Sequence, residues 1–185
     1  MGIDAGSRRA VFLDRDGVIN RALIRDGRPY PPRQLSDLEI VPGVRGALER
    51  LRAAGFALVV VTNQPDVARG LQRRDVVDAM HAYLASILPI DDFRVCLHDD
   101  ADGCACRKPN PGMLQAAADE LRLNLSASFM VGDRWRDVEA GRRAGCTTVF
   151  IDAGYEEQQP EAPDAIVKSL AEAANWILTT EGGTR

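Results

Sequence analysis

Two carboxylates, Asp14 and Asp16, stand one residue apart directly after the apolar run Ala10–Leu13. Such a run predicts a buried strand, and two like charges at its end repel each other unless a cation or a proton lies between them. Ionised carboxylates offer only oxygen acceptors, which are the ligands that Mg²⁺ prefers in proteins. The pair therefore predicts a site for a divalent metal, with a phosphate as the natural partner of that metal.

Polar side chains also follow three further apolar runs, each at the point where the run ends. They are Thr62, Asn63 and Gln64 after the second run, Cys96 and His98 after the third, and Asp133 and Asp137 after the fourth, with Arg107 and Lys108 a little beyond the third. Ligands of open α/β sheets bind outside the carboxyl ends of the strands, so we expect these groups to share one rim. Carboxylates, a hydroxyl and a lysine gathered there are the parts of a phosphoryl-transfer site.

Short β-branched runs alternate with helical patterns along the chain. The expected strands are Ala10–Leu13, Phe56–Thr62, Phe93–Cys96, Ser128–Val131 and Thr147–Ile151. The expected helices are Val44–Ala54, Arg73–Leu88, Pro111–Leu121, Arg136–Ala144 and a helix from Ser169 through Leu178. Repeated βαβ units predict an α/β fold, a Rossmann-like three-layer sandwich in which helices cover both faces of a mostly parallel central sheet.

Two segments are expected to lack regular structure. The stretch Arg25–Asp37 holds three prolines and predicts a loop just after the carboxylate pair. The last residues, 181–185, are expected to fray.

A third irregular segment, Leu97–Pro111, lies among closely spaced metal-ligating residues. Four such side chains fall within eleven residues: Cys96, His98, Cys104 and Cys106. Three thiols and one imidazole form the ligand set of a closed tetrahedral zinc site, which leaves no place for a reacting water. Such a zinc would be structural, because the loop 96–106 has almost no apolar residues of its own to fold it. The remaining cysteine, Cys146, is expected in the core, and His81 is assigned no partner and no role.

The composition argues against several classes of function. Lys and Arg number 23 against 27 Asp and Glu, a formal net charge of −4, and no basic run stands out. This charge argues against nucleic acid or an anionic membrane as a partner. The first residues lack the apolar core of a signal peptide, and no apolar run is long enough to span a bilayer. We therefore expect a cytoplasmic monomer that acts on a small phosphorylated metabolite and folds as one domain over residues 1–185.

The chemistry-bearing residues also follow a known order of motifs. Asp14-Arg15-Asp16-Gly17-Val18, Thr62, Lys108-Pro109 and Gly132-Asp133 with Asp137 resemble the four motifs of the haloacid dehalogenase-like phosphatases. The resemblance covers roughly Val11 to Ile151 and implies a single hydrolase domain of that superfamily. It also implies that Asp137, one helical turn beyond Asp133, orients Lys108 or a metal-bound water.

A mechanism comes with this resemblance. It implies that Asp14 attacks phosphorus and forms an aspartyl-phosphate, which splits hydrolysis into two easier steps. Asp16 would protonate the leaving oxygen and then take a proton from the attacking water. Mg²⁺ would lie between Asp14, the backbone carbonyl of Asp16 and Asp133. Thr62 and Lys108 would neutralise the non-bridging oxygens of the phosphate.

The cysteine-rich loop narrows the resemblance to one branch. A Cys-x-His…Cys-x-Cys loop that leads into Arg107-Lys108-Pro109 is similar to the branch of the D-glycero-D-manno-heptose 1,7-bisphosphate phosphatases and the histidinol-phosphate phosphatases. Members of this branch have no separate cap domain, and neither segment between the motifs here is long enough for one. The resemblance implies substrate contacts from four residues: Asn63, Gln64, Arg107 and Arg134.

Two activities of this branch stay open at this point. Thr62-Asn63-Gln64 followed by Val67-Ala68-Arg69-Gly70 is more similar to the heptose enzymes, which makes the heptose bisphosphate 7-phosphatase the leading expectation. The spacer Asp99–Gly103 is only five residues long, which resembles the histidinol-phosphate enzymes. Its acidic residues Asp99, Asp100 and Asp102 would suit a cationic amine or would face water. An alternative from another class is a non-catalytic zinc-containing binding module, and the complete set of catalytic residues argues against it.

Overall fold

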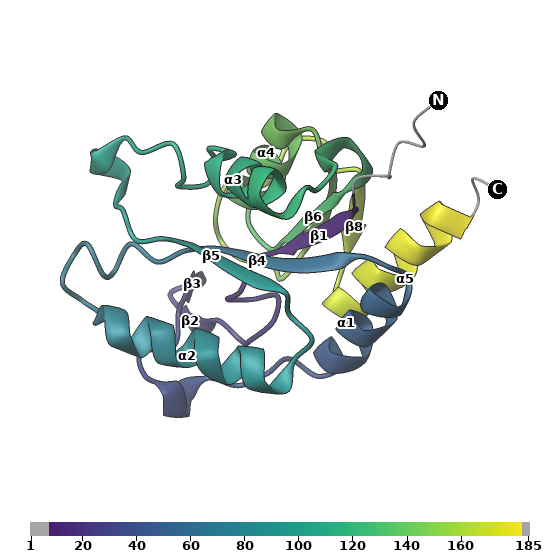
Figure 1. Ribbon diagram of the computed structural model, residues 1–185. Helices are drawn as coiled ribbons and strands as arrows, with labels where there is room; N and C mark the ends of the chain where they lie inside the picture. Colours follow the sequence, from purple (N-terminus) through teal and green to yellow (C-terminus); the bar gives the residue numbers. More distant parts are fainter. Residues whose placement is uncertain (1–7, 183–185) are drawn as a thin grey trace.

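Six strands form one parallel sheet in the computed structural model, which describes residues 8–182 (Figure 1). In spatial order they are β5 (Asp92–Cys96), β4 (Ala57–Asn63), β1 (Ala10–Leu13), β6 (Phe129–Gly132), β7 (Thr147–Ile151) and β8 (Ala165–Val167). The central strand β1 pairs in register with both neighbours, Leu13 lying opposite Val60 of β4 and Val131 of β6. Because all pairs are parallel, the carboxyl ends of the strands meet at one edge of the sheet.

Helices cover both faces of this sheet. On one face lie α1 (Val44–Ala53), α2 (Arg74–Ile87) and α5 (Leu170–Gly182), and on the other lie α3 (Gly112–Leu121) and α4 (Trp135–Ala144) (Figure 1). Side chains of β1 alternate between the two layers, Val11 packing with the α1 side and Phe12 with the α3 side. The four inner strands β4, β1, β6 and β7 are buried almost throughout, which is why their sequences are mainly apolar, whereas the edge strand β5 is half-buried and carries Asp92 and Arg94. The predicted α/β three-layer fold is confirmed.

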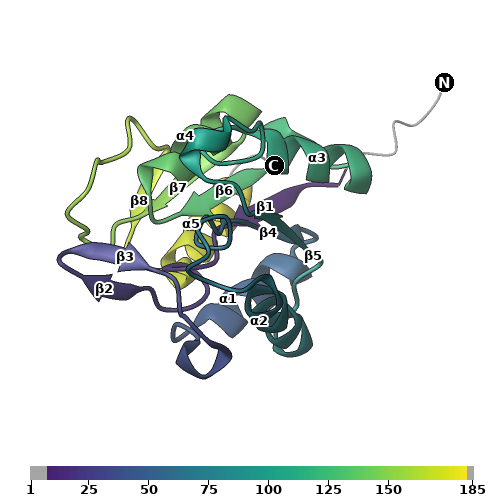
Figure 2. The ribbon, with the colours of Figure 1, turned by 90° about the vertical axis from the view of Figure 1, so that its left-hand side faces the viewer.

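The segment predicted as a loop, Arg25–Asp37, contains regular structure instead. Strands β2 (Leu23–Arg25) and β3 (Arg28–Tyr30) form an antiparallel hairpin beside the sheet, followed by a 3₁₀ turn at Leu35–Asp37 (Figure 2). Asp26 and Gly27 both adopt positive φ, 48° and 69°, as a tight hairpin turn requires. Pro29 is tolerated in β3 because each strand of a two-stranded ribbon is an edge strand, where some backbone N–H groups have no partner strand to bind. The sequence Asp26-Gly27 is typical of a hairpin turn, but the three nearby prolines favoured the prediction of a loop.

The remaining boundaries differ little from expectation. All five predicted helices form, with ends shifted by one or two residues, except that α5 runs on to Gly182 where fraying was expected from position 181. Residues 183–185 lie outside the described part of the chain. Strand β8 was not predicted, because three residues give no usable periodicity. Within residues 8–182 no separate cap domain covers the sheet edge, and no helix there has the length and apolar character needed to cross a membrane.

Candidate active site

Asp14 stands at the end of β1 with a buried lysine beside it. Its Oδ1 accepts a hydrogen bond from Lys108 Nζ at 2.8 Å, and the same ammonium reaches the carbonyl of Val61 at 2.7 Å and Asp137 Oδ1 at 2.7 Å. Burial raises the pKa of Asp14 to about 6, against the opposing effect of the Lys108 charge. Burial would lower the pKa of Lys108, but the two carboxylates reverse this and raise it. The lysine is therefore a fixed cation next to the predicted nucleophile.

Asp137 connects this lysine to the start of α4. One carboxylate oxygen holds Lys108, and the other accepts from the backbone N–H of Arg134 at 3.0 Å. Gly132 permits this approach, because a Cβ built there would lie only 2.1 Å from the Asp137 Cβ. Both oxygens of Asp137 are thus occupied. The geometry agrees with the expected role of orienting Lys108.

Asp133 has the features of a cation ligand. Its Oδ1 is buried and has no hydrogen-bond partner, an arrangement that costs free energy unless an ion or a water completes it. Carboxylate oxygens of Asp14, Asp133 and Asp137 lie within 4.8 Å of one another. Burial, with the charges of Asp14 and Asp137, raises the pKa of Asp133 well above its usual range. A divalent cation would relieve this repulsion, so the residues present fit Mg²⁺.

Asp16 is held by donors on both of its oxygens. The guanidinium of Arg15 binds it in a fork at 3.0 and 2.9 Å, Asn20 Nδ2 donates to Oδ1 at 2.9 Å, and Gln64 Nε2 donates to Oδ2 at 2.8 Å. Burial would raise the pKa of Asp16, but the charge and hydrogen bonds of Arg15, with those of Asn20 and Gln64, hold it below the usual value. In this arrangement Asp16 is a carboxylate in a fixed orientation, ready to accept a proton.

Two expectations about neighbouring residues need correction. Gln64 is fully buried behind the site, where it also donates to Thr62 Oγ1 at 2.9 Å, so it positions Asp16 and Thr62 and does not line the cavity. His81 does have a partner: its Nε2 lies 3.1 Å from Arg15 Nη1, and its ring stacks on Phe93 with centroids 4.9 Å apart. Burial and the Arg15 charge lower the pKa of His81 to about 4, so the neutral ring accepts a hydrogen bond from the guanidinium.

Asn63 binds the backbone on which Lys108 is carried. Its Nδ2 donates to the Lys108 carbonyl at 3.0 Å, and its Oδ1 accepts from the Lys108 N–H at 3.1 Å. This pair of bonds joins the end of β4 to the segment that delivers the lysine. Asn63 also lines the cavity, so the predicted substrate contact remains a prediction.

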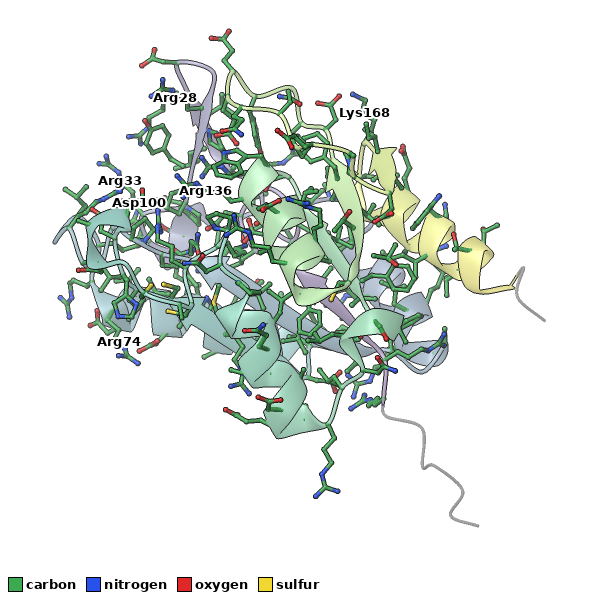
Figure 3. All side chains as sticks on the ribbon, turned by 90° about the horizontal axis from the view of Figure 1, so that it is seen from above. Arg28, Arg33, Arg74, Asp100, Arg136 and Lys168 are labelled. Carbon is green, nitrogen blue, oxygen red and sulfur yellow. The ribbon has the colours of Figure 1, made fainter. Side chains whose placement is uncertain are left out.

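A cavity of about 270 Å³ opens above Asp14 and is rimmed by arginines. Its cationic lining comprises Lys108, Arg28 of the hairpin, Arg69, Arg107, Arg134 and Arg136. Asp100 Oδ1 accepts hydrogen bonds from two of these arginines, from Arg107 Nε at 2.8 Å and from Arg136 Nη1 at 3.1 Å. Figure 3 labels Asp100 and Arg136. The cavity is therefore suited to an anionic ligand longer than a single phosphate.

The acidic residues of the short loop are all engaged by the protein itself. Asp99 binds Arg69 Nε at 2.9 Å and caps the 3₁₀ turn Asp100–Asp102, while Asp102 Oδ2 accepts from the Asp99 N–H at 2.7 Å. The carboxylates organise the loop and hold the arginines in place. They leave no cluster of free negative charge for a cationic amine.

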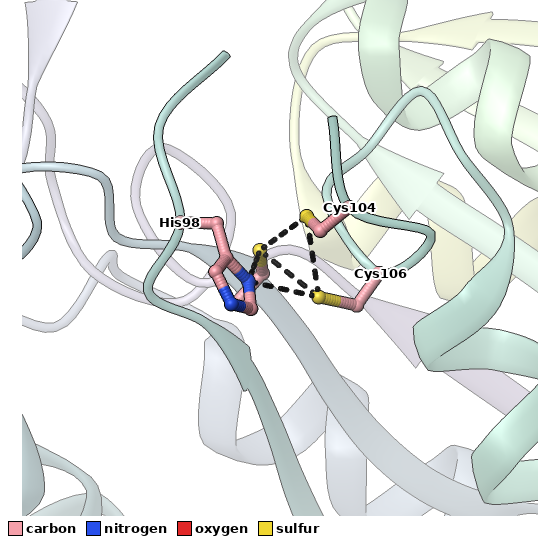
Figure 4. Close-up of side chains that lie close together, drawn as sticks. His98, Cys104 and Cys106 are labelled. Atoms are coloured by element: carbon pink, nitrogen blue, oxygen red, sulfur yellow. Dashed lines mark hydrogen bonds between the residues drawn. The ribbon is translucent and has the colours of Figure 1, made fainter. Parts of the chain in front are cut away.

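The four predicted zinc ligands converge at the base of this loop (Figure 4). The Sγ atom of Cys96 lies 3.7 Å from that of Cys104 and 3.2 Å from that of Cys106, and Cys104 and Cys106 are 3.5 Å apart. His98 Nδ1 is 3.5 Å from Cys96 Sγ and 3.3 Å from Cys106 Sγ. Sulfurs on a tetrahedral zinc stand roughly 3.8 Å apart, given Zn–S bonds of about 2.3 Å. The cluster fits a structural zinc, and Cys146 is buried in the core elsewhere.

Several residues of the site carry no signal in the sequence. Arg28 and Arg136 reach the cavity only because the hairpin and the α4 start flank the sheet edge. Tyr155 follows β7 and donates from its hydroxyl to Asp133 Oδ2 at 2.7 Å. A polar aromatic residue soon after a strand end was the available hint, because that position falls on the same rim as the motifs.

The fold and the site together define a hydrolase of the haloacid dehalogenase-like class, and comparisons with known proteins agree. A family model described as HAD-hydrolase-like matches residues 105–173. The chain is 37% identical to the D-glycero-D-manno-heptose-1,7-bisphosphate 7-phosphatase of Thermosynechococcus vestitus, over 93% of this chain and 96% of that protein. Its identity to the D-glycero-beta-D-manno-heptose-1,7-bisphosphate 7-phosphatase of Escherichia coli is 36%, over 95% of this chain and 91% of that protein.

A solved structure shows the same relationship. The D,D-heptose 1,7-bisphosphate phosphatase of B. bronchiseptica, complexed with magnesium and phosphate, superposes with a TM-score of 0.79 at 32% identity, covering 93% of this chain and 99% of that one. The protein therefore belongs to the family of D-glycero-D-manno-heptose-1,7-bisphosphate 7-phosphatases and is a phosphatase. The resemblance drawn from the sequence motifs is confirmed.

Gly17 gives a direct test of the metal-site geometry. Its φ is +92°, and a Cβ there would lie 1.8 Å from Asp133 Oδ2. We expect Gly17→Ala to displace Asp133 and to lower both the affinity for Mg²⁺ and the turnover by about 10- to 100-fold. The weaker affinity should appear as a smaller rise in melting temperature at each Mg²⁺ concentration. Thermal denaturation at increasing MgCl₂ measures the effect. Gly46→Ala is the control, because nothing lies within 4 Å of a Cβ at that helical position. A Gly17→Ala protein with an unchanged Mg²⁺ response would contradict this geometry.

Proposed function

We propose that this protein hydrolyses the 7-phosphate of D-glycero-D-manno-heptose 1,7-bisphosphate in a Mg²⁺-dependent reaction. The observation that carries the proposal is the arginine-rimmed cavity directly above Asp14 and Lys108. A bisphosphate has one phosphate for the nucleophile and a second for the rim. Family membership at 37% identity over nearly the whole chain supports the same substrate.

The chain's own residues divide the reaction between them. Asp14 attacks phosphorus, so that a carboxylate–phosphorus bond forms while the bond to the sugar oxygen breaks. Lys108 and Thr62 neutralise the non-bridging oxygens. Asp16 is ionised in the free enzyme, so it takes up a proton from solvent before the chemical step, gives that proton to the leaving sugar oxygen and later regains one from the water that attacks the aspartyl-phosphate. Asp14, Asp133 and the backbone carbonyl of Asp16 would hold Mg²⁺, which screens the nucleophile from the phosphate charge when it is bound.

The second phosphate is assigned to the outer part of the cavity. Arg107 and Arg136 share Asp100 there, and Arg134 at the start of α4 is held by Glu157 at 2.8 and 2.6 Å. These pairs fix the guanidinium groups before substrate arrives, which lowers the entropy cost of binding. Arginine also suits a phosphate because it donates two parallel hydrogen bonds.

The same features argue against the histidinol-phosphate alternative. That substrate carries a cationic amine, and the acidic residues Asp99, Asp100 and Asp102 all have partners within the protein. At the rim the arginines Arg28, Arg69, Arg107, Arg134 and Arg136 outnumber the carboxylates Asp66 and Asp100, so an anionic group is favoured there over a cationic one. The acidic residues of the short spacer therefore stabilise the loop itself and are not available to bind a cationic substrate group.

A substrate comparison tests the proposal. We expect kcat/KM for the heptose 1,7-bisphosphate to exceed that for histidinol phosphate by roughly 100-fold or more, because only the bisphosphate offers a second phosphate to the arginines at the rim. Steady-state release of inorganic phosphate measures both values with the same preparation. Equal values, or a preference for histidinol phosphate, would contradict the assignment.

An arginine of the rim gives a sharper prediction. Arg136→Gln removes one charged donor, and we expect KM for the bisphosphate to rise by about 10-fold or more, since a hydrogen bond to a charged group contributes about 1.5–3 kcal/mol. Turnover of a simple monophosphate should change little. Arg142→Gln is the control, because Arg142 lies on the same helix and pairs with Glu139 on the exposed surface. An Arg136→Gln enzyme that loses activity equally on both substrates would count against a second phosphate at this position.

Further properties belong to the proposal as well. We assign the zinc a structural role, since its four ligands leave no open position. A monomeric state, one domain over residues 1–185, a cytoplasmic location and the absence of nucleic-acid and membrane partners stay predictions from the sequence.

A further inference from the structure

We infer that Tyr155 is a positioning residue for the metal site, whose hydroxyl orients Asp133 so that a single carboxylate oxygen is presented to the cation. This inference rests on the proposed function, which places Mg²⁺ on Asp133. It adds a residue from the loop between β7 and β8, a segment that none of the sequence motifs includes.

The two oxygens of Asp133 have different surroundings. Oδ2 accepts a hydrogen bond from the Tyr155 hydroxyl at 2.7 Å, whereas Oδ1 is buried and has no partner. A carboxylate with one oxygen engaged offers the other as a monodentate ligand. Hydrogen bonds to metal ligands of this kind set the ligand's orientation, and their loss typically costs 10- to 100-fold in affinity or activity.

The Tyr155 hydroxyl donates to Asp133 Oδ2, and it must do so whenever a cation is bound, because a carboxylate that ligates a metal is ionised. An ionised carboxylate in turn has only acceptors to offer. The direction of the hydrogen bond is therefore fixed, and it persists when a cation lies on the other oxygen.

The loop that carries Tyr155 is anchored through the two residues that follow it. The backbone N–H of Glu156 donates to the Gly27 carbonyl of the hairpin at 2.9 Å, and Glu157 binds Arg134 in a two-bond pair. Across the site, the bare backbone of Gly17 approaches so closely that a Cβ there would lie 2.8 Å from the Tyr155 hydroxyl. Tyr155 is thus fixed between the hairpin, the α4 start and the loop after β1.

Tyr155→Phe removes one oxygen atom and tests this role. We expect the MgCl₂ midpoint, taken as the concentration that raises the melting temperature by a fixed amount, to increase by about 10- to 100-fold. The kcat of the variant should return close to the wild-type value once Mg²⁺ is saturating. Tyr83→Phe is the matched control, because Tyr83 is a partly exposed residue of α2, and it should titrate as the wild type does.

Asp133→Asn separates this inference from the proposed metal site. If Asp133→Asn loses the Mg²⁺ response while Tyr155→Phe keeps the wild-type midpoint, the site stands and the role of Tyr155 is overturned. That role is also overturned if Tyr155→Phe lowers the melting temperature equally at every Mg²⁺ concentration, since a purely structural contact behaves in this way. If Asp133→Asn responds to Mg²⁺ as the wild type does, both the metal assignment and the inference are overturned.

Discussion

Replacing Asp14 with asparagine is expected to lower kcat by roughly 10⁴- to 10⁶-fold, the scale on which the loss of a covalent nucleophile is felt. An amide nitrogen or oxygen does not attack phosphorus. Asp137 is held by Lys108, and Asp133 is assigned to Mg²⁺, so neither is expected to replace Asp14 as the nucleophile. Phosphate release from the heptose bisphosphate, followed with excess enzyme over many hours, measures the residual rate.

The Asp14→Asn protein should remain folded, because asparagine has the same shape and Lys108 keeps two of its partners, Asp137 and the Val61 carbonyl. The raised pKa of Asp14 also predicts how the stability of the variant relative to wild type depends on pH.

The folded-state pKa of Asp14, about 6, lies above the ordinary value of 3.8. Ionisation of Asp14 therefore destabilises the folded wild-type protein, and stability is lost as pH rises through 6. In metal-free buffer the variant should therefore gain melting temperature relative to wild type above pH 6 and not below pH 4.

Asp119→Asn is the control for this experiment, since Asp119 is an exposed residue of α3 away from the cavity. It should leave kcat within about twofold. A folded Asp14→Asn enzyme with undiminished turnover would remove Asp14 from the chemistry and with it the aspartyl-phosphate.

The second large effect is expected at the zinc cluster. Cys104→Ser should reduce the bound zinc from near one equivalent per chain to a small fraction and lower the melting temperature by about 10 °C, because serine is a poor zinc ligand and the loop has few apolar residues to hold it. Metal analysis of protein purified without added zinc gives the first value, and calorimetry gives the second.

Disorder of the loop 96–106 should also weaken substrate binding. Arg107 Nη1 donates to the carbonyl of His98, a predicted zinc ligand, at 3.3 Å, and Asp100 in the same loop holds Arg136. We expect KM for the bisphosphate to rise in Cys104→Ser more than kcat falls. Cys146→Ala removes a buried thiol outside the cluster and should keep both the zinc and the KM. A Cys104→Ser protein with full zinc content and an unchanged melting temperature would refute the structural zinc.

The sequence was sufficient for the architecture where the signal is periodic. Mainly apolar runs located the inner strands β1, β4, β6 and β7, because both faces of these strands are buried. The short run Phe93–Cys96 located the half-buried edge strand β5, and the 3.6-residue pattern located all five helices. The motif residues Asp14, Lys108, Asp133 and Asp137 do meet at the sheet edge. Their convergence was predictable because parallel strands end on the same side.

What the sequence did not reveal depends on contacts between distant segments. Arg15 and His81 are 66 positions apart, and nothing local to α2 indicates that its histidine faces the guanidinium beside Asp16. The burial of Gln64 and the contact of Tyr155 with Asp133 are of the same kind. The hairpin at Leu23–Tyr30 was missed for a local reason, the weight given to prolines over the Asp26-Gly27 turn.

The most direct test of the central claim is ³¹P NMR of heptose 1,7-bisphosphate incubated with the enzyme and Mg²⁺. We expect the resonance of the 7-phosphate to disappear and that of inorganic phosphate to grow, while the resonance of the 1-phosphate stays at full intensity. Loss of the 1-phosphate signal, or a spectrum that does not change while histidinol phosphate is hydrolysed in a parallel sample, would contradict that claim.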